Sequence, residues 1–258
     1  MNLNLKSIKP KRQVKPPRII LYGSPGIGKS SFAASIGNAL FLDVEGGTLN
    51  LTVNRIERGL LETTDEVISA LNAVLVQEHD FSAVVIDTAD FMERVFMKQA
   101  AVEHGVSEYA KIGYGKGPIT VVNIWRGILQ QLDMIREQRN MAIILIAHET
   151  LKRINEPDVD VYDKFTLAME NKSIDLLEAW ADCVLFAKEE VYTQTGKDKR
   201  VRASAGDRML FTRDCPRHLA KNRYNLPEAI PLSWDAFAAE FAKGTAEPQS
   251  VSLTNQGE

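Results

Sequence analysis

The chain has 258 residues, of which 45% are hydrophobic and 25% charged, and its 31 basic and 34 acidic side chains give a net charge of −3. These proportions are typical of a globular protein and exclude wholesale disorder and a fibrous repeat. The charge disfavours a protein that coats nucleic acid through bulk positive charge, although it is compatible with a local basic groove.

Nothing in the sequence indicates a membrane or secretory protein. The longest purely apolar run, residues 141–147, is far shorter than the roughly 20 residues that a membrane-spanning helix needs. The first residues contain no apolar segment of the kind found in a signal peptide. Cys183 and Cys215 lack metal-ligand spacing, so we interpret both as reduced thiols. We therefore expect a cytoplasmic protein without a membrane partner.

The two ends differ in composition from the middle. Residues 1–17 carry five basic side chains, no acids and three prolines, which predicts a flexible basic arm, either functional or a solvated leader. Residues 243–258 hold almost no large apolar side chain, which predicts a disordered tail. The folded core is therefore expected over residues 18–242.

The first two thirds of this core alternate between short apolar runs and amphipathic segments. A capping box at Thr63–Glu66 and Pro118 in a first turn mark two of the helix starts. Strands are expected at 18–22, 39–44, 81–86 and 141–147, and helices at 30–36, from 63 onward, at 91–103 and from Pro118 onward. Continuous apolar strands separated by helices predict an α/β fold with a mostly parallel sheet covered by helices on both faces.

After Trp180 the pattern changes to strands without intervening helices. Residues 183–193 and 200–204 flank Thr195-Gly-Lys-Asp198, which predicts a hairpin. Residues 208–212 and 218–221 are candidates for further strands. We expect these segments to extend one edge of the parallel sheet with antiparallel strands.

The strongest motif follows the first strand. Gly23-Ser-Pro-Gly-Ile-Gly-Lys29-Ser30 matches GxxxxGK[ST], and it stands between a strand and a helix as a phosphate-binding loop requires. Such a loop turns backbone N–H groups toward phosphate oxygens, while its lysine reaches the β- and γ-phosphates and its serine binds Mg²⁺. The nucleotide-binding residues are predicted to be Gly23, Ser24, Pro25, Gly26, Ile27, Gly28, Lys29, Ser30 and Ser31. ATP and Mg²⁺ are the expected cofactors.

Asp87 ends the apolar run 81–86 and suits the Walker B position, from which a carboxylate holds Mg²⁺. The alternative is an N-cap of the following helix. Asp90 is interpreted as a charge at the start of that helix.

A water-activating group is expected at the end of another strand. Thr88, beside the Walker B residue, is not a carboxylate, whereas Glu45 follows the second strand and precedes two glycines. Ligands in open α/β sheets bind at this edge, so Glu45 is the candidate and Asp43 is assigned a structural bond. His148 ends the fourth strand and is either a γ-phosphate sensor or an ordinary polar residue.

Four segments in order, LYGSPGIGKS, LFLDVEGG, AVVIDTAD and ILIAHE, together resemble the RecA-like core ATPases over about residues 18–237. The closest likeness is to short phage-encoded members that act in single-strand annealing and recombination. The resemblance implies that Glu45 is the catalytic carboxylate and that the strand ending in His148 lies between the Walker A and Walker B strands. It also implies DNA, other copies of the chain and a single-strand-binding protein as partners, in the cytoplasm of the host.

Further residues follow from the resemblance. Lys221 and Arg223 are similar to a Lys-Asn-Lys stretch that reaches the nucleotide of a neighbouring protomer, although a surface basic pair on an edge strand is an equal alternative. The family places DNA on two loops, here residues 108–117 and roughly 150–171. Aromatic and basic side chains suit single strands, through stacking and phosphate contacts. The DNA-contact candidates are Tyr109, Lys111, Tyr114, Lys116, Lys152 and Arg153.

The predicted function is that of an oligomeric, single-stranded-DNA-binding ATPase of recombination or annealing. An ATP-switched loader or adaptor for a replication protein, and another P-loop enzyme such as a nucleotide kinase, are the alternatives. We see no arginine-rich lid of the kind that a kinase needs.

Overall fold

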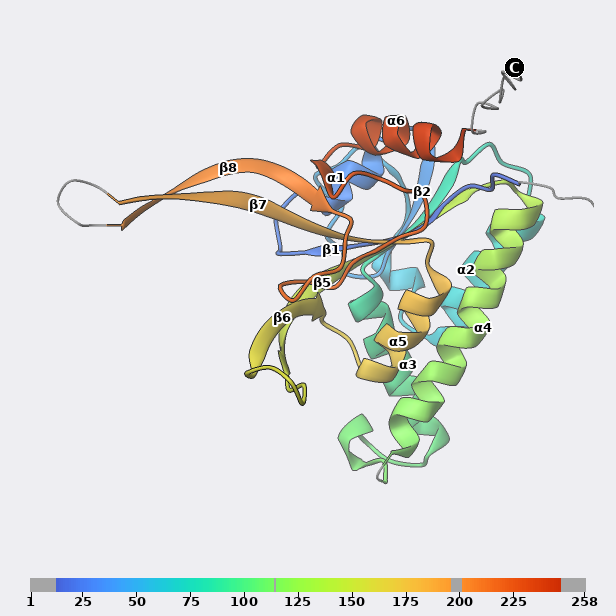
Figure 1. Cartoon of the computed structure of the whole chain (residues 1–258). Helices are drawn as coiled ribbons and strands as arrows, with labels where there is room; N and C mark the ends of the chain where they lie inside the picture. The colour runs from blue at the N-terminus through green and yellow to red at the C-terminus, as the bar shows by residue number, and fades with distance from the viewer. Residues whose placement is uncertain (1–12, 114, 196–200, 247–258) are drawn as a thin grey trace, which may run out of the picture.

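A computed structural model describes residues 13–113, 115–195 and 201–246 of the chain, without the side chains of 191–205. It shows a sheet with helices on both faces and a long two-stranded ribbon projecting from one edge (Figure 1). The predicted fold class, a mostly parallel α/β sheet with an antiparallel edge extension, is confirmed. Within the described residues, no helix has the length and apolar character needed to cross a bilayer.

The parallel part of the sheet has the strand order β7-β1-β5-β4-β2-β3. Its strands are β1 (Arg18–Gly23), β2 (Ala39–Asp43), β3 (Asn54–Ile56), β4 (Ala83–Asp87), β5 (Ala142–Ile154) and β7 (Cys183–Thr195). Strand β5 lies between β1, which precedes the phosphate loop, and β4, which ends in Asp87. The expected place of the strand carrying His148 is therefore confirmed.

Antiparallel strands extend the β7 side of the sheet and build a separate hairpin on β5. They are β6 (Tyr162–Leu167), β8 (Val201–Phe211), β9 (Lys221–Asn222) and β10 (Ala229–Pro231). Strand β8 pairs with β7 and β10, β9 pairs with β7, and β6 pairs with the far half of β5. The two strands expected at 200–204 and 208–212 are one strand, β8, and most of the turn expected at 195–198 lies outside the described residues.

An apolar core lies on each face of the sheet, between the sheet and the helices that cover it. Helices α2 (Thr64–Val76), α3 (Ala89–Glu103), α4 (Lys116–Gln138) and α5 (Asn171–Trp180) pack on one face, and α1 (Lys29–Ala34) and α6 (Trp234–Thr245) on the other (Figure 1). Along β1, Ile20 and Tyr22 face the first core while Ile19 and Leu21 face the second, as the two-residue period of a strand requires. Both faces are thus buried around the strand that positions the phosphate loop.

Some boundaries differ from the expectation. Strand β5 continues to Ile154, and the segment expected as a loop at 150–171 forms the β5–β6 hairpin, because its residues pair in register from Glu149↔Leu167 to Ile154↔Tyr162. Helices α5 and α6 were not predicted, and α6 extends past the expected core boundary at 242. Of the predicted arm, residues 1–12 lie outside the described residues, whereas Pro17 accepts a hydrogen bond from the backbone N–H of Ile143.

Candidate active site at the carboxyl edge of the sheet

The phosphate loop connects β1 to α1, and its glycines are required by the local backbone. Gly28, the residue before α1, has φ 114°, and Gly26 has φ 76°, a region that side-chain-bearing residues rarely adopt. At Gly23 the cause is different, because an added Cβ would lie 2.2 Å from the carbonyl oxygen of Ala187 on β7. The close pairing of β1 and β7 therefore excludes a side chain at the start of the loop.

Lys29 is folded onto the loop itself. Its Nζ donates to the carbonyl oxygens of Gly23 at 2.8 Å and Ser24 at 2.9 Å, and the residue is only 6% exposed. Burial lowers the pKa of this ammonium group. The cation is held where the phosphates of a bound nucleotide are expected.

Asp87 and Ser30 meet across the sheet edge. The hydroxyl of Ser30 donates to Oδ2 of Asp87 at 2.6 Å, and Asp87 is 3% exposed. Burial raises the pKa of Asp87 to about 6, and the nearby charges of Asp43 and Glu45 act in the same direction. A hydroxyl and a carboxylate are oxygen ligands of the kind that Mg²⁺ takes together with waters and substrate phosphates, so this pair fits that ion. Thr88, not Asp87, is the residue before α3, which favours the Walker B interpretation over the N-cap.

Glu45 follows β2 and faces this edge. Its backbone N–H donates to the carbonyl of Asp87, and its Oε2 accepts from the hydroxyl of Thr88 at 3.3 Å. Asp43 instead accepts bonds from the backbone of Gly46 and its two following residues, and from the hydroxyl of Thr48, so it organises the turn after β2. The geometry agrees with a structural role for Asp43 and leaves Glu45 available to a substrate.

His148 lies between two carboxylates. Its Nδ1 is 3.0 Å from Oδ2 of Asp90, its backbone N–H donates to the other oxygen of Asp90, and its Nε2 is 3.9 Å from Oε2 of Glu45. The hydrogen bond to Asp90 raises the pKa of His148, and the charge of Glu45 adds to that effect. The interpretation of Asp90 as a helix-start charge was incomplete, because this buried residue in the first turn of α3 orients the histidine.

The sequence matches the family model described as an AAA domain over residues 15–224. The chain belongs to the AAA domain family. Its phosphate loop and its Ser30–Asp87 pair are those of a P-loop ATPase. A crystal structure of the RadB recombinase is 13% identical to this chain, with a TM-score of 0.44, and the match covers 86% of this chain and 90% of that one. No curated protein matches the sequence significantly.

The sequence analysis did not predict one basic residue that lies near the phosphate loop of this AAA domain protein. Nη1 of Arg208, on β8, lies 3.7 Å from the position that a Cβ on Gly28 would occupy. The side chain is exposed. No motif places Arg208 there, because its distance from the loop depends on the pairing of β8 with β7.

Lys221 and Arg223 lie far from the phosphate loop of their own copy of the AAA domain protein. Strand β9 pairs with the first residues of β7, at the sheet edge opposite the loop. Nζ of Lys221 donates to the carbonyls of Glu178 and Ala179 at the end of α5, and Arg223 lies 3.4 Å from Oδ1 of Asp182. Neither residue reaches the nucleotide site of its own copy, so their role in trans stays a prediction.

In the first predicted DNA loop, some of the candidate side chains contact other residues of the protein. The ring of Tyr109 packs beside Gly117, where an added Cβ would lie 2.9 Å from Cε2, and burial raises the pKa of Tyr109 to about 12. Lys111 donates to Ser107, and Lys116 is exposed at the start of α4. Tyr114 lies outside the described residues. In this arrangement Tyr109 packs against the protein, and the two lysines are accessible.

The second predicted DNA segment is the outer part of the β5–β6 hairpin. Lys152 and Arg153 are both exposed on β5. They pair in register with Lys164 and Asp163 on β6, and Lys164 is engaged with Asp214. The hairpin and the start of α4 extend from the same side of the molecule (Figure 1).

Proposed function

We propose that this AAA domain protein is an ATP-hydrolysing, oligomeric, single-stranded-DNA-binding protein of recombination or single-strand annealing. The observation that carries the ATPase part is the convergence of Lys29, Ser30 and Asp87 with Glu45 and His148 at one edge of the sheet. These groups come from four different segments of the chain, and they supply the functions that phosphoryl transfer to water requires.

Each residue has a distinct task in this proposal. Lys29 exchanges its two carbonyl contacts for phosphate oxygens and compensates their charge. Mg²⁺, held by Ser30 and Asp87, would neutralise charge on the phosphates. Glu45 orients a water and accepts its proton.

His148 serves as a hydrogen-bond donor toward the γ-phosphate. Asp90 holds Nδ1, and the raised pKa favours the protonated ring, so Nε2 also carries a proton that it can donate. Asp90 in this position thus stabilises the doubly protonated ring, the form of the histidine that can donate from Nε2.

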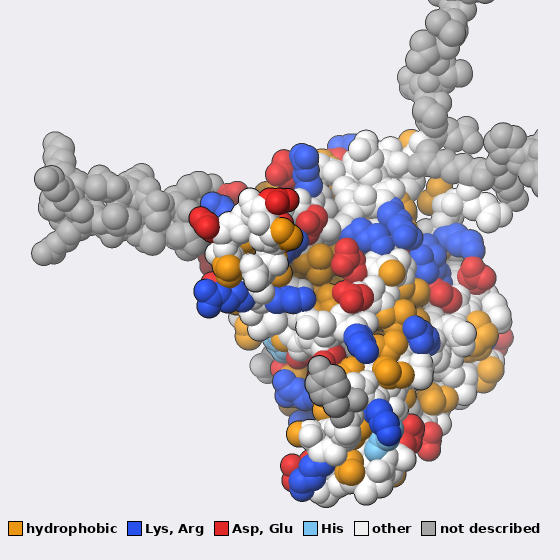
Figure 2. All heavy atoms as spheres, turned by 60° about the horizontal axis from the view of Figure 1, so that its bottom comes forward, with side chains coloured by type: hydrophobic (Ala, Val, Ile, Leu, Met, Phe, Trp, Pro, Cys, Tyr) orange, Lys and Arg blue, Asp and Glu red, His pale blue; other side chains and the backbone are white. Residues whose placement is uncertain are grey.

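The DNA part of the proposal is supported by the location of exposed basic groups. Lys111, Lys116, Lys152 and Arg153 belong to the two segments that extend from one side of the molecule. Figure 2 shows lysine and arginine side chains spread over this face, with acidic side chains between them. Single strands need only local basic contacts of this kind, which is consistent with the net charge of −3.

The decisive experiment compares ATP turnover with and without single-stranded DNA, followed by measurement of the assembly size with ATP. We expect stimulation by single strands, little stimulation by duplex, and an oligomer. Absence of stimulation together with a strict monomer would refute the proposal. Negligible turnover with a direct protein partner would instead favour the loader.

A further inference from the structure

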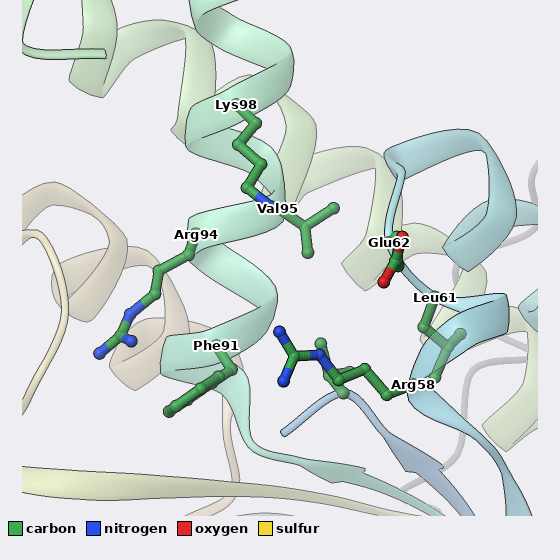
Figure 3. Close-up of a pocket in the computed structure, with 8 residues that line it drawn as sticks. Arg58, Leu61, Glu62, Phe91, Arg94, Val95 and Lys98 are labelled. Atoms are coloured by element: carbon green, nitrogen blue, oxygen red, sulfur yellow. The ribbon is translucent and has the colours of Figure 1, made fainter. Parts of the chain in front are cut away.

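A small pocket lies beside the candidate active site, between the short helix η2 (Arg58–Leu60) and α3 (Figure 3). Its volume is about 150 Å³. Its apolar lining comes from Val44, Leu61, Phe91 and Val95. Arg58, Arg94, Lys98 and Glu62 are the charged residues around it, with Arg58 extending across the pocket toward α3 (Figure 3).

Among the described residues, the three cations of this pocket have no carboxylate partner. In the part of the chain that the structure describes, no ion pair within 4.0 Å joins Arg58, Arg94 or Lys98 to an acid. The guanidinium of Arg94 lies 4.2 Å from the ring centroid of Phe91, and all three cationic side chains are exposed. Three cations against the single acid Glu62 leave a positive site with an apolar floor, which fits a ligand that is both anionic and apolar.

A segment with that chemistry is present in the same chain. The tip of the β5–β6 hairpin, residues 155–161, reads Asn-Glu-Pro-Asp-Val-Asp-Val and contains no basic residue. Val159 is 53% exposed and Val161 45% exposed, and they alternate with the exposed acids Asp158 and Asp160. These acids disfavour nucleic acid at the tip itself, in contrast to Lys152 and Arg153 nearer the body.

We propose that the hairpin tip of one copy docks in the Arg58/Arg94/Lys98 pocket of a neighbouring copy. Asp158 and Asp160 would meet the three cations, and the valines would cover the apolar floor. The inference rests on the self-assembly included in the proposed function. In a head-to-tail arrangement each copy gives its tip to one neighbour and its pocket to another, so the contact is heterologous and generates a ring or a filament.

This contact would act on ATP turnover as well as on assembly. Val44 of the pocket immediately precedes Glu45, and Cδ of Arg58 lies 3.9 Å from the position of a Cβ on Gly46. The ring of Phe91 is also 6.2 Å from that of His148. A tip seated in the pocket therefore touches the segment that carries the water-activating acid and a ring that lies beside the sensor.

Charge reversal on each surface tests the proposal. Arg94→Glu/Lys98→Glu alters the pocket, and Asp158→Lys/Asp160→Lys alters the tip. With Mg²⁺ and a non-hydrolysable ATP analogue, we expect each variant alone to shift to monomer in sedimentation velocity. An equimolar mixture should assemble again, because alternating copies pair an acidic pocket with a basic tip and a wild-type pocket with a wild-type tip.

Two controls separate the outcomes. Arg126→Glu, an exposed reversal on α4, should leave assembly unchanged, and thermal unfolding should show that every variant is folded. Oligomers of wild-type size from both reversed variants would overturn the docking while leaving self-assembly intact. Loss of single-stranded-DNA affinity at unchanged size would also overturn it, since the pocket would then bind DNA phosphate.

Cross-linking gives a test that does not depend on assembly in dilute solution. Lys98→Cys and Val159→Cys proteins, mixed at high concentration with a mild oxidant, should form a disulfide-linked heterodimer. Each variant alone gives the background from Cys183, which is buried, and Cys215. If the wild-type protein is a monomer, the self-assembly included in the proposed function is refuted. If the cross-link does not form, the docking of the tip in the pocket is refuted.

Discussion

Glu45 is the residue on which the ATPase proposal depends most directly. Its Oε2 lies 3.9 Å from Nε2 of His148, and the residue stands in the turn that Asp43 fixes after β2. We predict that Glu45→Gln retains ATP binding but hydrolyses ATP about 10²–10⁴-fold more slowly, the usual contribution of a general base. Turnover in single-turnover assays and nucleotide binding by fluorescence would measure the two effects.

The matched control is Glu57→Gln, which removes an exposed carboxylate from the same region of the chain. It should leave turnover unchanged. Normal hydrolysis by the Glu45→Gln protein would exclude Glu45 from the mechanism.

Asp87 makes a prediction about pH and stability. Burial raises its pKa to about 6 from an ordinary value of 3.8. The stabilising neutral form is therefore complete below about pH 4 and is lost as the pH rises through 6, at a cost of at most about 3 kcal/mol. We predict that Asp87→Asn raises the free energy of unfolding of the nucleotide-free protein at pH 8, with the gain vanishing near pH 4.

Urea unfolding at the two pH values measures this difference. The same variant should lose the extra stability that Mg²⁺ and ATP together give the wild-type protein. A variant less stable than wild type at pH 8 would show that burial does not penalise the carboxylate.

The residues of the site differ in how far their roles could be predicted from sequence. Lys29, Ser30 and Asp87 belong to local motifs at strand ends, and parallel strands bring such ends to one edge. The Asp90–His148 bond and the approach of Arg208 to Gly28 depend on side-chain conformations and strand pairing between distant segments. No local pattern encodes contacts of that kind.

At the scale of elements, the pairing of β1 with β7 constrains the phosphate loop. Gly23→Ala would place a Cβ 2.2 Å from the carbonyl oxygen of Ala187, which is backbone and cannot rotate away. We predict a loss of about 1–3 kcal/mol or more of stability, together with weaker ATP binding as the loop shifts. Denaturant unfolding and nucleotide titration would measure both.

Gly47→Ala is the matched control, because among the described residues no atom beyond its chain neighbours lies within 4 Å of the position of its Cβ. It should be close to wild type in both measurements. Equal effects of the two substitutions would mean that the close pairing of β1 and β7 does not exclude a side chain at position 23.

Elements with local signals were predictable, and those that depend on distant partners were not. The capping box of α2 is present as expected, with Thr63 and Glu66 bonded reciprocally. The resemblance predicted a loop where the β5–β6 hairpin lies, and the sequence there, which mixes basic, acidic and apolar residues, gave no strand signal against it. The outer half of β5 and strand β6 form because they pair with each other, and the residue pattern of one segment alone does not reveal such pairing.

At the scale of the whole molecule, the nucleotide site and the Lys221/Arg223 pair lie at opposite edges of the sheet. A role for Arg223 in hydrolysis therefore requires a second copy. We predict that Arg223→Ala and Glu45→Gln proteins, each defective alone, regain ATPase activity when mixed. Some sites in the mixture would then combine an intact Glu45 with an intact Arg223.

A mixture of Glu45→Gln with Lys29→Ala provides the contrast. Both of these residues belong to the same copy's site, so mixing creates no intact site and should restore nothing. Equal behaviour of the two mixtures would remove Arg223 from the trans role and leave it as a partner of Asp182.

Strand β5 runs without interruption from the sheet interior, where it pairs with β1, into the hairpin that it forms with β6. It passes His148 beside the phosphate loop and ends at Ile154 in the hairpin. At about 3.3 Å per residue, the part beyond His148 is an arm about 20 Å long. A ligand that displaces the hairpin would therefore pull directly on the strand that carries the imidazole. Binding at the surface and chemistry at the nucleotide would then be coupled through one continuous backbone segment.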